Sequence, residues 1–232
     1  MRALTVALGL TVSACVTSAP RAPELRTPED RFSYSIGAKL GGDLRKSGHE
    51  LDRELLLRGV EDGLEGRVTL SDAALTEAMQ EGVARRRDRD ESARAERAAQ
   101  AEQEGRAFLA ENAKRPRVVT LPSGVQYEVL KAGSGNSPSV EDFVTCRYRG
   151  SLLDGTVFDD TESVGLPRTF AVTSVVDGLE EALVRMSPGA RWNVWVPPEK
   201  GYGASRPGAK IPANATLVFE IELVELAKRP SY

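Results

Sequence analysis

The segment from Ser71 to Asn112 constrains the fold more than any other part of the chain. It runs without a Gly-Pro break, and alanine and other residues of good helix propensity fill much of it. Ser71 is a favourable N-cap, and the apolar residues after it recur on one helical face: Ala74, Leu75, Ala78, Met79 and Val83. A helix of this length is roughly 60 Å long at about 1.5 Å per residue. The fold must therefore accommodate one long helix.

The second half of this helix is charged. From Arg85 to Arg106 it has almost no large apolar side chain, and acidic and basic residues alternate over residues 85–91. A coiled-coil seam needs apolar a and d positions, so we expect a solvated helix held by i,i+4 ion pairs. Interleaved acids cancel the field of the arginines, and the formal net charge of the chain is only −3. We therefore expect no nucleic-acid partner.

Two shorter helical patterns precede the long helix. Phe32, Ile36, Leu40 and Leu44 recur every four residues until Gly48, and a second pattern runs over residues 51–64, ending near Gly66. Such short amphipathic helices make a thin core, for which a partner subunit is one common remedy. We expect residues 29–83 to form a helical homodimerisation domain and residues 84–115 a solvated linking helix. A closed monomeric bundle is the alternative.

The pattern changes after Lys114-Arg115-Pro116. Alternating and β-branched residues predict strands at residues 118–120, 125–130, 143–153, 191–196 and 215–226, with Gly- and Pro-containing turns between them. One short helix fits residues 178–186. We expect residues 116–232 to form an antiparallel β half-barrel wrapped on that helix. The fold class is then α+β, with an N-terminal all-α dimerisation module and a long linking helix before the barrel.

The first residues indicate export. Met1-Arg2 is followed by an apolar stretch too short to span a bilayer, and then by Ser13-Ala14-Cys15. This resembles a bacterial lipoprotein signal, which implies residues 1–14 as signal peptide, lipidation of Cys15 and membrane anchoring. Residues 15–28 would form a flexible tether. The expected location is the bacterial cell envelope, on the outer membrane facing the periplasm or cell surface. An ordinary signal peptide cut near Ala19 is the alternative.

The second half of the chain carries a family pattern. Its members are Arg147-Tyr148-Arg149-Gly150, Leu153-Asp154-Gly155, Phe158-Asp159, residues 175–183, Gly201-Tyr202-Gly203, Ile211-Pro212 and residues 215–219. Together they resemble FKBP-type peptidyl-prolyl cis-trans isomerases. The front half, with residues 32–37, 108–112 and 120–127, resembles the macrophage infectivity potentiator branch. That branch implies a dimerising helical module, a linking helix and an isomerase domain.

The resemblance implies a pocket for proline-containing, unfolded polypeptides. Rotation about an X-Pro bond crosses about 18–20 kcal/mol, and an apolar, water-poor pocket favours the twisted state, in which amide resonance is lost. Such isomerisation needs no nucleophile, metal or cofactor. The catalytic residues would be Tyr148, Phe158, Asp159, Tyr202 and Phe219. The substrate-binding residues would be Phe170, Val175, Val176, Leu179 and Ile211, with the Val176 amide and Tyr202 bonding substrate carbonyls.

Two residues depart from the family pattern. Leu179 stands where the family usually has a tryptophan floor, which implies a roomier pocket. Arg168 stands where an aromatic residue often forms the rim, which would either favour an acidic or polar residue before proline or weaken the binding of small peptides. Both departures favour slightly the alternative function, a client-binding chaperone with little or no isomerase activity. A purely structural lipoprotein would not need the pocket residues at all.

Other chemistries find little support in the sequence. Asp159 and Asp160 are adjacent on an expected strand, so their side chains point to opposite faces. The glycines of residues 203–208 lack the Lys-Ser/Thr of a phosphate-binding loop. His49 is the single histidine, which excludes a histidine triad or cluster. We expect Cys146 to be a buried small hydrophobic residue rather than a nucleophile.

Overall fold

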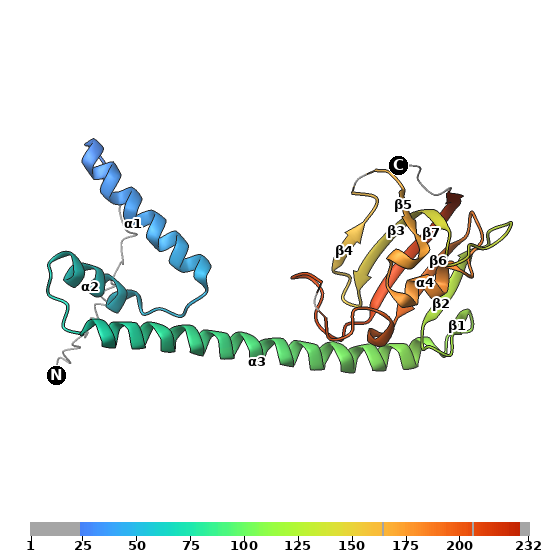
Figure 1. Ribbon diagram of the computed structural model, residues 1–232, viewed down its shortest axis with the longest axis horizontal. Helices are drawn as coiled ribbons and strands as arrows, with labels where there is room; N and C mark the ends of the chain where they lie inside the picture. Colours follow the sequence, from blue (N-terminus) through green and yellow to red (C-terminus); the bar gives the residue numbers. More distant parts are fainter. Residues whose placement is uncertain (1–23, 164, 206, 228–232) are drawn as a thin grey trace, which may run out of the picture. The chain divides into compact units, whose positions relative to one another are not determined.

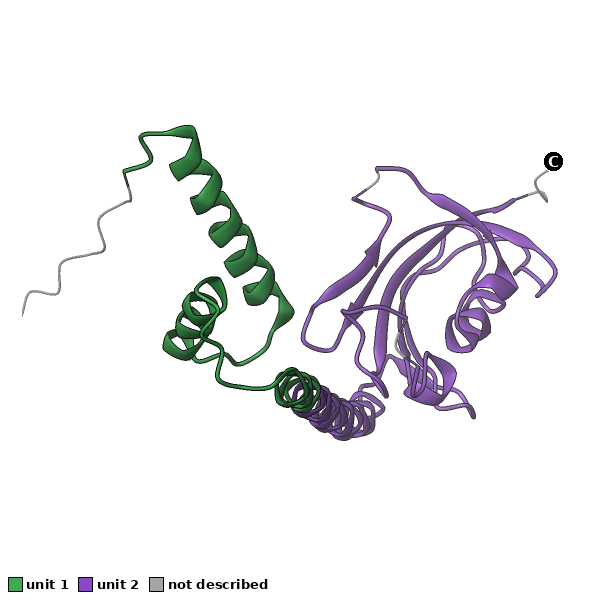
Figure 2. Cartoon of the chain, turned by 60° about the vertical axis from the view of Figure 1, so that its left-hand side comes forward, with its two compact units in different colours: residues 1–83 green, residues 84–232 purple. Residues whose placement is uncertain are grey.

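The computed structural model describes residues 24–163, 165–205 and 207–227. The chain divides after Val83 into two compact units, coloured separately in Figure 2. The expected signal peptide at residues 1–14, Cys15 and most of the expected tether lie outside the described residues.

The first unit contains α1 (Pro28–Ser47), α2 (Arg53–Leu64) and the start of α3 (Asp72–Asn112), labelled in Figure 1. A capping box opens α1: the Asp30 amide donates to Thr27 Oγ1 over 3.0 Å, and the Thr27 amide donates to Asp30 Oδ2 over 2.9 Å. The helix α1 ends at Gly48, where the sequence predicted its end, and Gly48 takes the left-handed conformation with a φ of 68°. Ser71 Oγ accepts from the Ala74 amide, which fits its expected N-cap role.

No residue from 24 to 83 is buried. The apolar side chains that predicted the helices are largely exposed instead: Phe32, Ile36, Leu40, Leu51, Leu55, Val60, Leu64, Met79 and Val83. Within this unit, a single chain thus builds no core of its own. The helices form where the sequence places them, but their apolar faces remain uncovered.

The second unit is built on one antiparallel sheet. Its described strands follow the order β1-β2-β6-β7-β3-β4, and β5 also pairs with β3. The bounds are β1 Val118–Thr120, β2 Gln126–Lys131, β3 Phe143–Leu152, β4 Val157–Asp160, β5 Arg168–Ala171, β6 Arg191–Val196 and β7 Leu217–Ala227. The sheet curves around the short helix α4 (Asp177–Leu183), as Figures 1 and 2 show. Two 3₁₀ turns, Val172–Ser174 and Pro198–Lys200, complete the unit.

The α+β fold class is confirmed, including the antiparallel sheet around one helix. The core lies between α4 and the concave face of the sheet, where Leu183, Val194 and Ile221 are fully buried. The strands β4 and β5 were absent from the predicted set, although Asp159 and Phe170 were treated as strand residues. Both are four residues long and mix charged with apolar residues, so pairing with β3 defines them rather than alternation.

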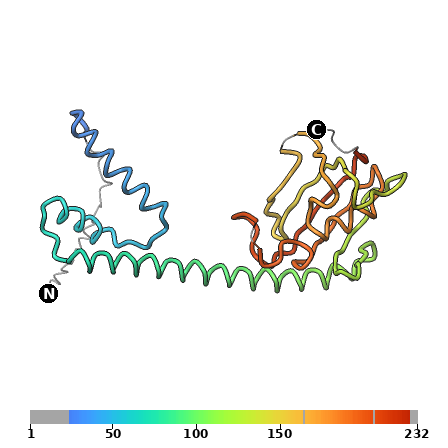
Figure 3. The backbone as a smooth tube through the Cα atoms, viewed as in Figure 1, coloured from blue at the N-terminus to red at the C-terminus, as the bar shows by residue number. Residues whose placement is uncertain are grey.

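The C-terminal half of α3 packs against the sheet. Gly105 and Asn112 are its buried residues, and the Phe108 ring lies 6.3 Å from that of Trp195. Asn112 Nδ2 donates to Gln126 Oε1 over 2.8 Å. Figure 3 shows residues 207–214, in orange-red, running beside this part of α3, where Asn214 Nδ2 donates to Glu102 Oε2 over 3.2 Å. The solvated linking helix predicted for residues 84–115 is therefore solvated only in its first half.

A buried carboxylate strengthens this junction. The Glu128 side chain is only 2% exposed and pairs with Arg115 over 2.6 Å and Arg117 over 2.9 Å. The Arg117 contact lies within ion-pair distance but lacks hydrogen-bond geometry, so Arg115 is the stronger partner. Arg115 also donates to Asn112 Oδ1 and lies over the Trp195 ring. The polar network thus fixes the end of α3 to β2 and β6.

Candidate functional site

A cavity of about 260 Å³ opens beside α4, between the strands that carry the predicted site residues. Every one of those residues except Ile211 lines it: Tyr148, Phe158, Asp159, Phe170, Val175, Val176, Leu179, Tyr202 and Phe219. Ser174 and Arg168 complete the lining. Sequence reasoning did not name Ser174, and its position directly before Val175 was the only signal for it.

The floor and walls of this cavity are apolar. Leu179, on the first turns of α4, is 3% exposed and forms the floor. The Phe158 and Phe219 rings meet edge to face at a centroid distance of 5.8 Å, and Tyr148 meets Phe170 in the same way at 6.2 Å. Such edge-to-face pairs hold aromatic walls in a fixed orientation. The cavity can therefore enclose a small apolar ring.

One edge of the cavity is polar. Tyr148 Oη donates to Asp159 Oδ2 over 2.7 Å, and Arg168 Nη1 donates to Tyr148 Oη over 2.9 Å. The other carboxylate oxygen of Asp159 accepts from the Asp160 amide. The Asp160 side chain is paired instead with Arg149, over 3.6 Å. The two adjacent carboxylates thus have separate partners, in line with the opposite faces expected from the sequence.

Both tyrosine hydroxyls of the cavity stay protonated at neutral pH. Burial raises the pKa of Tyr148 to about 12; the hydrogen bond and charge of Asp159 add to this effect, and Arg168 opposes it. Burial, followed by the charge of Asp159, also raises the pKa of Tyr202. Since Tyr148 already gives its single proton to Asp159, Tyr202 is the hydroxyl that can donate a hydrogen bond to a ligand.

Two local features place the Tyr148 and Phe158 rings. A Cβ on Gly150 would lie 2.5 Å from Phe158 Cε2, so only glycine lets this ring cross β3 so closely. Thr161 holds the backbone of Tyr148 from the other side: its Oγ1 accepts from the Tyr148 amide over 2.9 Å and donates to the Tyr148 carbonyl over 3.1 Å. Thr161 is buried, which keeps these bonds out of water.

Tyr202 reaches the cavity from the segment that follows β6, described over residues 197–205 and 207–214. The Gly203 amide donates to Pro198 O over 2.9 Å, and the Asn214 amide donates to Gly203 O over 2.7 Å, which closes this segment on itself. Asn214 adopts a φ of 59°, a conformation that asparagine tolerates better than most residues. Ile211 differs from its expected place: it is 6% exposed and packs in the core rather than lining the cavity.

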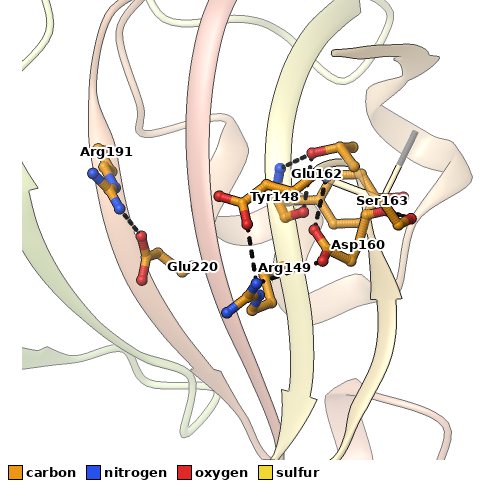
Figure 4. A network of polar contacts seen from close by, with 8 residues as sticks. Tyr148, Arg149, Asp160, Glu162, Ser163, Arg191 and Glu220 are labelled. Carbon is orange, nitrogen blue, oxygen red and sulfur yellow. Dashed lines mark hydrogen bonds and ion pairs between the residues drawn. The ribbon is translucent and has the colours of Figure 1, made fainter. Parts of the chain in front are cut away.

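A second hollow, of about 320 Å³, lies on the outer face of the sheet. Its lining is charged and internally paired, as Figure 4 shows for Arg191 with Glu220 and for Arg149 with Asp160 and Glu162. It offers no apolar floor, although it is larger than the cavity at α4. We therefore regard the smaller cavity as the candidate active site.

Other chemistries find no second centre in the described residues. In the described ranges, no three His, Cys, Asp or Glu side chains are grouped so that they could hold a metal ion. Cys146 is fully buried, and burial raises the pKa of its thiol to about 12, which leaves it unreactive at neutral pH. None of the helices that the structure describes is long and apolar enough to cross a membrane.

Comparison with known proteins identifies the class. Residues 135–224 match the model of the FKBP-type peptidyl-prolyl cis-trans isomerase domain. Residues 29–129 match the model of the domain amino-terminal to such isomerases. The chain therefore belongs to the FKBP-type peptidyl-prolyl cis-trans isomerase family.

Relatives that match nearly the full length of the chain show which branch of the family it belongs to. The outer membrane protein MIP of Legionella longbeachae is 38% identical, with 98% of each chain covered. The peptidyl-prolyl cis-trans isomerase Mip of Coxiella burnetii is 37% identical, with 92% of this chain and 93% of the relative covered. Within the family, this chain is a Mip-like isomerase. The comparisons do not favour the client-binding chaperone alternative.

A solved structure shares the whole arrangement of domains. The crystal structure of FkpA from Escherichia coli matches with a TM-score of 0.76 and 31% identity, over 89% of this chain and all of that one. An N-terminal helical domain followed by an isomerase domain is thus common to both chains.

Proposed function

We propose that the cavity at α4 is the site where this chain isomerises X-Pro bonds of exported polypeptides and so assists their folding. The observation that carries the proposal is that this cavity combines a buried Leu179 floor, aromatic walls and one polar edge. A proline ring fits an apolar enclosure of this kind, because most ligand pockets pair apolar walls with few polar groups.

Desolvation would supply most of the catalysis. A planar amide owes its rotational barrier to resonance, and the twisted amide has lost both that resonance and its charge separation. An apolar floor therefore stabilises the twisted state relative to the planar state. The Tyr202 hydroxyl would donate to a substrate carbonyl, since its raised pKa keeps the proton on oxygen. The Val176 amide would be the second donor, as the family resemblance implies, and Val176 lines the cavity as the N-cap residue of α4.

The test is the cis-to-trans rate of X-Pro peptides with the full chain. Tyr202→Phe removes one hydrogen-bond donor and should lower kcat/KM by roughly 3- to 10-fold, as one hydrogen bond would. Phe219→Ala opens a wall and should lower it further. Tyr127→Phe is the matched control, because this tyrosine stacks on Trp192 outside the cavity. Equal rates for all four proteins would reject the assignment of the cavity.

We also propose that residues 29–83 form a homodimer. The support is the uncovered apolar surface of α1, α2 and the start of α3, whose residues are nowhere buried in one chain. Leu55, on α2, is 71% exposed, and Leu55→Glu should convert a dimer into a monomer in size-exclusion chromatography with light scattering. Leu166→Glu, at a site 69% exposed in the other unit, should leave the dimer intact. A monomeric wild-type chain would refute the dimer.

We further propose that the chain belongs to the bacterial cell envelope, with lipid on Cys15 as its anchor to the outer membrane. A relative named as an outer membrane protein supports the location, and the Ser13-Ala14-Cys15 sequence supports the lipid. Mass spectrometry of the mature N-terminus should find an acylated Cys15, and Cys15→Ala should release the protein from membranes. A mature chain that starts near Ala19 without lipid would refute the anchor.

A further inference from the structure

Arg168 places a positive charge on the rim of the isomerase cavity. It is the first residue of β5, and Phe170, two residues further on, shares its face of the strand and also lines the cavity. The Arg168 side chain is 53% exposed, so its guanidinium lies where cavity meets solvent. When the proline of a substrate lies on the cavity floor, the side chain of the residue before proline therefore lies near the Arg168 guanidinium.

The guanidinium is already held in place. Nη1 donates to Tyr148 Oη over 2.9 Å and lies 3.5 Å from Asp159 Oδ2. Both contacts use this one nitrogen, and within the described residues no hydrogen bond is recorded for Nη2 or Nε. A guanidinium presents five N–H donors in a rigid fork that matches a carboxylate. Arg168 is thus fixed through one arm while the other donors remain available to a ligand.

The carboxylate of Asp159 neutralises the positive charge of Arg168 only in part. Its oxygens also accept from the Tyr148 hydroxyl and the Asp160 amide, which spread its negative charge over neutral donors. Arg168 is the one cation and Asp159 the one carboxylate among the described residues that line the cavity, so the unused donors of Arg168 can attract an anionic side chain.

We propose that Arg168 is a specificity-determining residue, which selects prolines that follow an acidic residue. The proline ring occupies the apolar floor, and the carboxylate of the preceding Glu or Asp pairs with the free donors of Arg168. This inference rests on the proposed function of the cavity. It names a substrate class for that site, X-Pro segments in which X is acidic.

The experiment compares kcat/KM of the full chain for peptides that differ in one isosteric pair, Glu-Pro and Gln-Pro. A charge-assisted hydrogen bond at a half-exposed site is expected to favour Glu-Pro about 5-fold, which corresponds to ~1 kcal/mol. Arg168→Gln should bring the Glu/Gln ratio close to one, and Arg168→Lys should retain part of the preference. Raising ionic strength from about 0.1 M to about 1 M should also reduce it, since the screening length falls from about 10 Å to about 3 Å.

Arg149→Gln is the matched control. Arg149 is 52% exposed, lies next to Tyr148 in sequence, and points to the outer face of the sheet, where it pairs with Asp160 and Glu162 (Figure 4). Its loss removes the same charge from the same domain and should leave the Glu/Gln ratio unchanged. A ratio near one in the wild type, or an equal ratio in Arg168→Gln, would overturn the proposal.

These outcomes are separate from failure of the cavity assignment. If Phe219→Ala abolishes turnover of a neutral Leu-Pro peptide, the assignment stands whatever the Glu/Gln ratio is. If no X-Pro peptide is accelerated by the wild-type chain, both the assignment and the specificity of Arg168 are refuted.

Discussion

Gly105→Ala tests how closely α3 must approach the sheet. A Cβ at this position would lie 2.3 Å from Thr216 Oγ1 and 3.3 Å from Thr216 Cβ. Thr216 is 2% exposed and β-branched, so its side chain has little freedom to withdraw. Overpacking of this kind costs roughly 1–3 kcal/mol, and the short distance favours the upper end. Because alanine has a higher helix propensity than glycine, the substitution also stabilises the helix by about 1 kcal/mol. The net expectation is a loss of about 1–2 kcal/mol.

Urea unfolding, monitored by tryptophan fluorescence, measures this loss of stability in the isomerase unit. The chain has two tryptophans, and both Trp192 and Trp195 belong to β6 of the isomerase unit. Gly82→Ala is the matched control, because it lies in the same helix and its Cβ would meet nothing within 4 Å. Its expected effect is neutral or stabilising.

A second substitution checks the cause of the effect. Thr216→Ala removes the atom that the new Cβ would strike, so it should recover part of the loss when combined with Gly105→Ala. Non-additivity of about 1 kcal/mol or more is expected for residues in such contact. If Gly105→Ala were as stable as Gly82→Ala, the close approach of α3 would not constrain the fold, and our reasoning would be refuted.

Two further predictions concern buried groups. Arg115→Ala should destabilise the isomerase unit by roughly 3 kcal/mol in the same assay, because it leaves the Glu128 carboxylate buried beside a weaker partner. Arg117→Ala, at a side chain 77% exposed, should cost less than about 1 kcal/mol, and equal losses would contradict this ranking. Because the folded-state pKa of Cys146 is raised from 9.0 to about 12, the folded state binds the proton more tightly, so stability should fall as pH rises from about 9 towards 12. Cys146→Ala should flatten that fall, measured as the urea midpoint against pH, whereas an unchanged slope would exclude the thiol as its cause.

The helices were predictable because their signals are local. The four-residue period of Phe32, Ile36 and Leu40, the glycine at 48 and the cap at Ser71 fix where α1 ends and α3 begins. The long strands were predictable by their alternation. The strands β4 and β5 were not, since each exists only because β3 offers an edge for pairing.

The members of the candidate site came from the family pattern, and their contacts required the fold. No sequence pattern indicated that Arg168 would bond the Tyr148 hydroxyl, because the two residues lie twenty positions apart on paired strands. For Ile211, the family pattern predicted a place in the cavity that the structure does not show. A single apolar residue in a segment rich in glycine, alanine and proline has no periodicity to show which face it takes, and here it joins the core.

The docking of α3 determines which proteolytic fragments of this enzyme would remain intact. The arginines of residues 85–97 are a natural target for trypsin-like proteases, and cleavage there would leave Glu102, Gly105 and Phe108 seated on the sheet. Cleavage after Arg117 would instead separate α3 from the first strand, take the Phe108 ring away from Trp195 and remove Arg115 and Arg117, the partners of Glu128. A stable proteolytic fragment that contains the isomerase domain would therefore begin within the helix, well before the first strand.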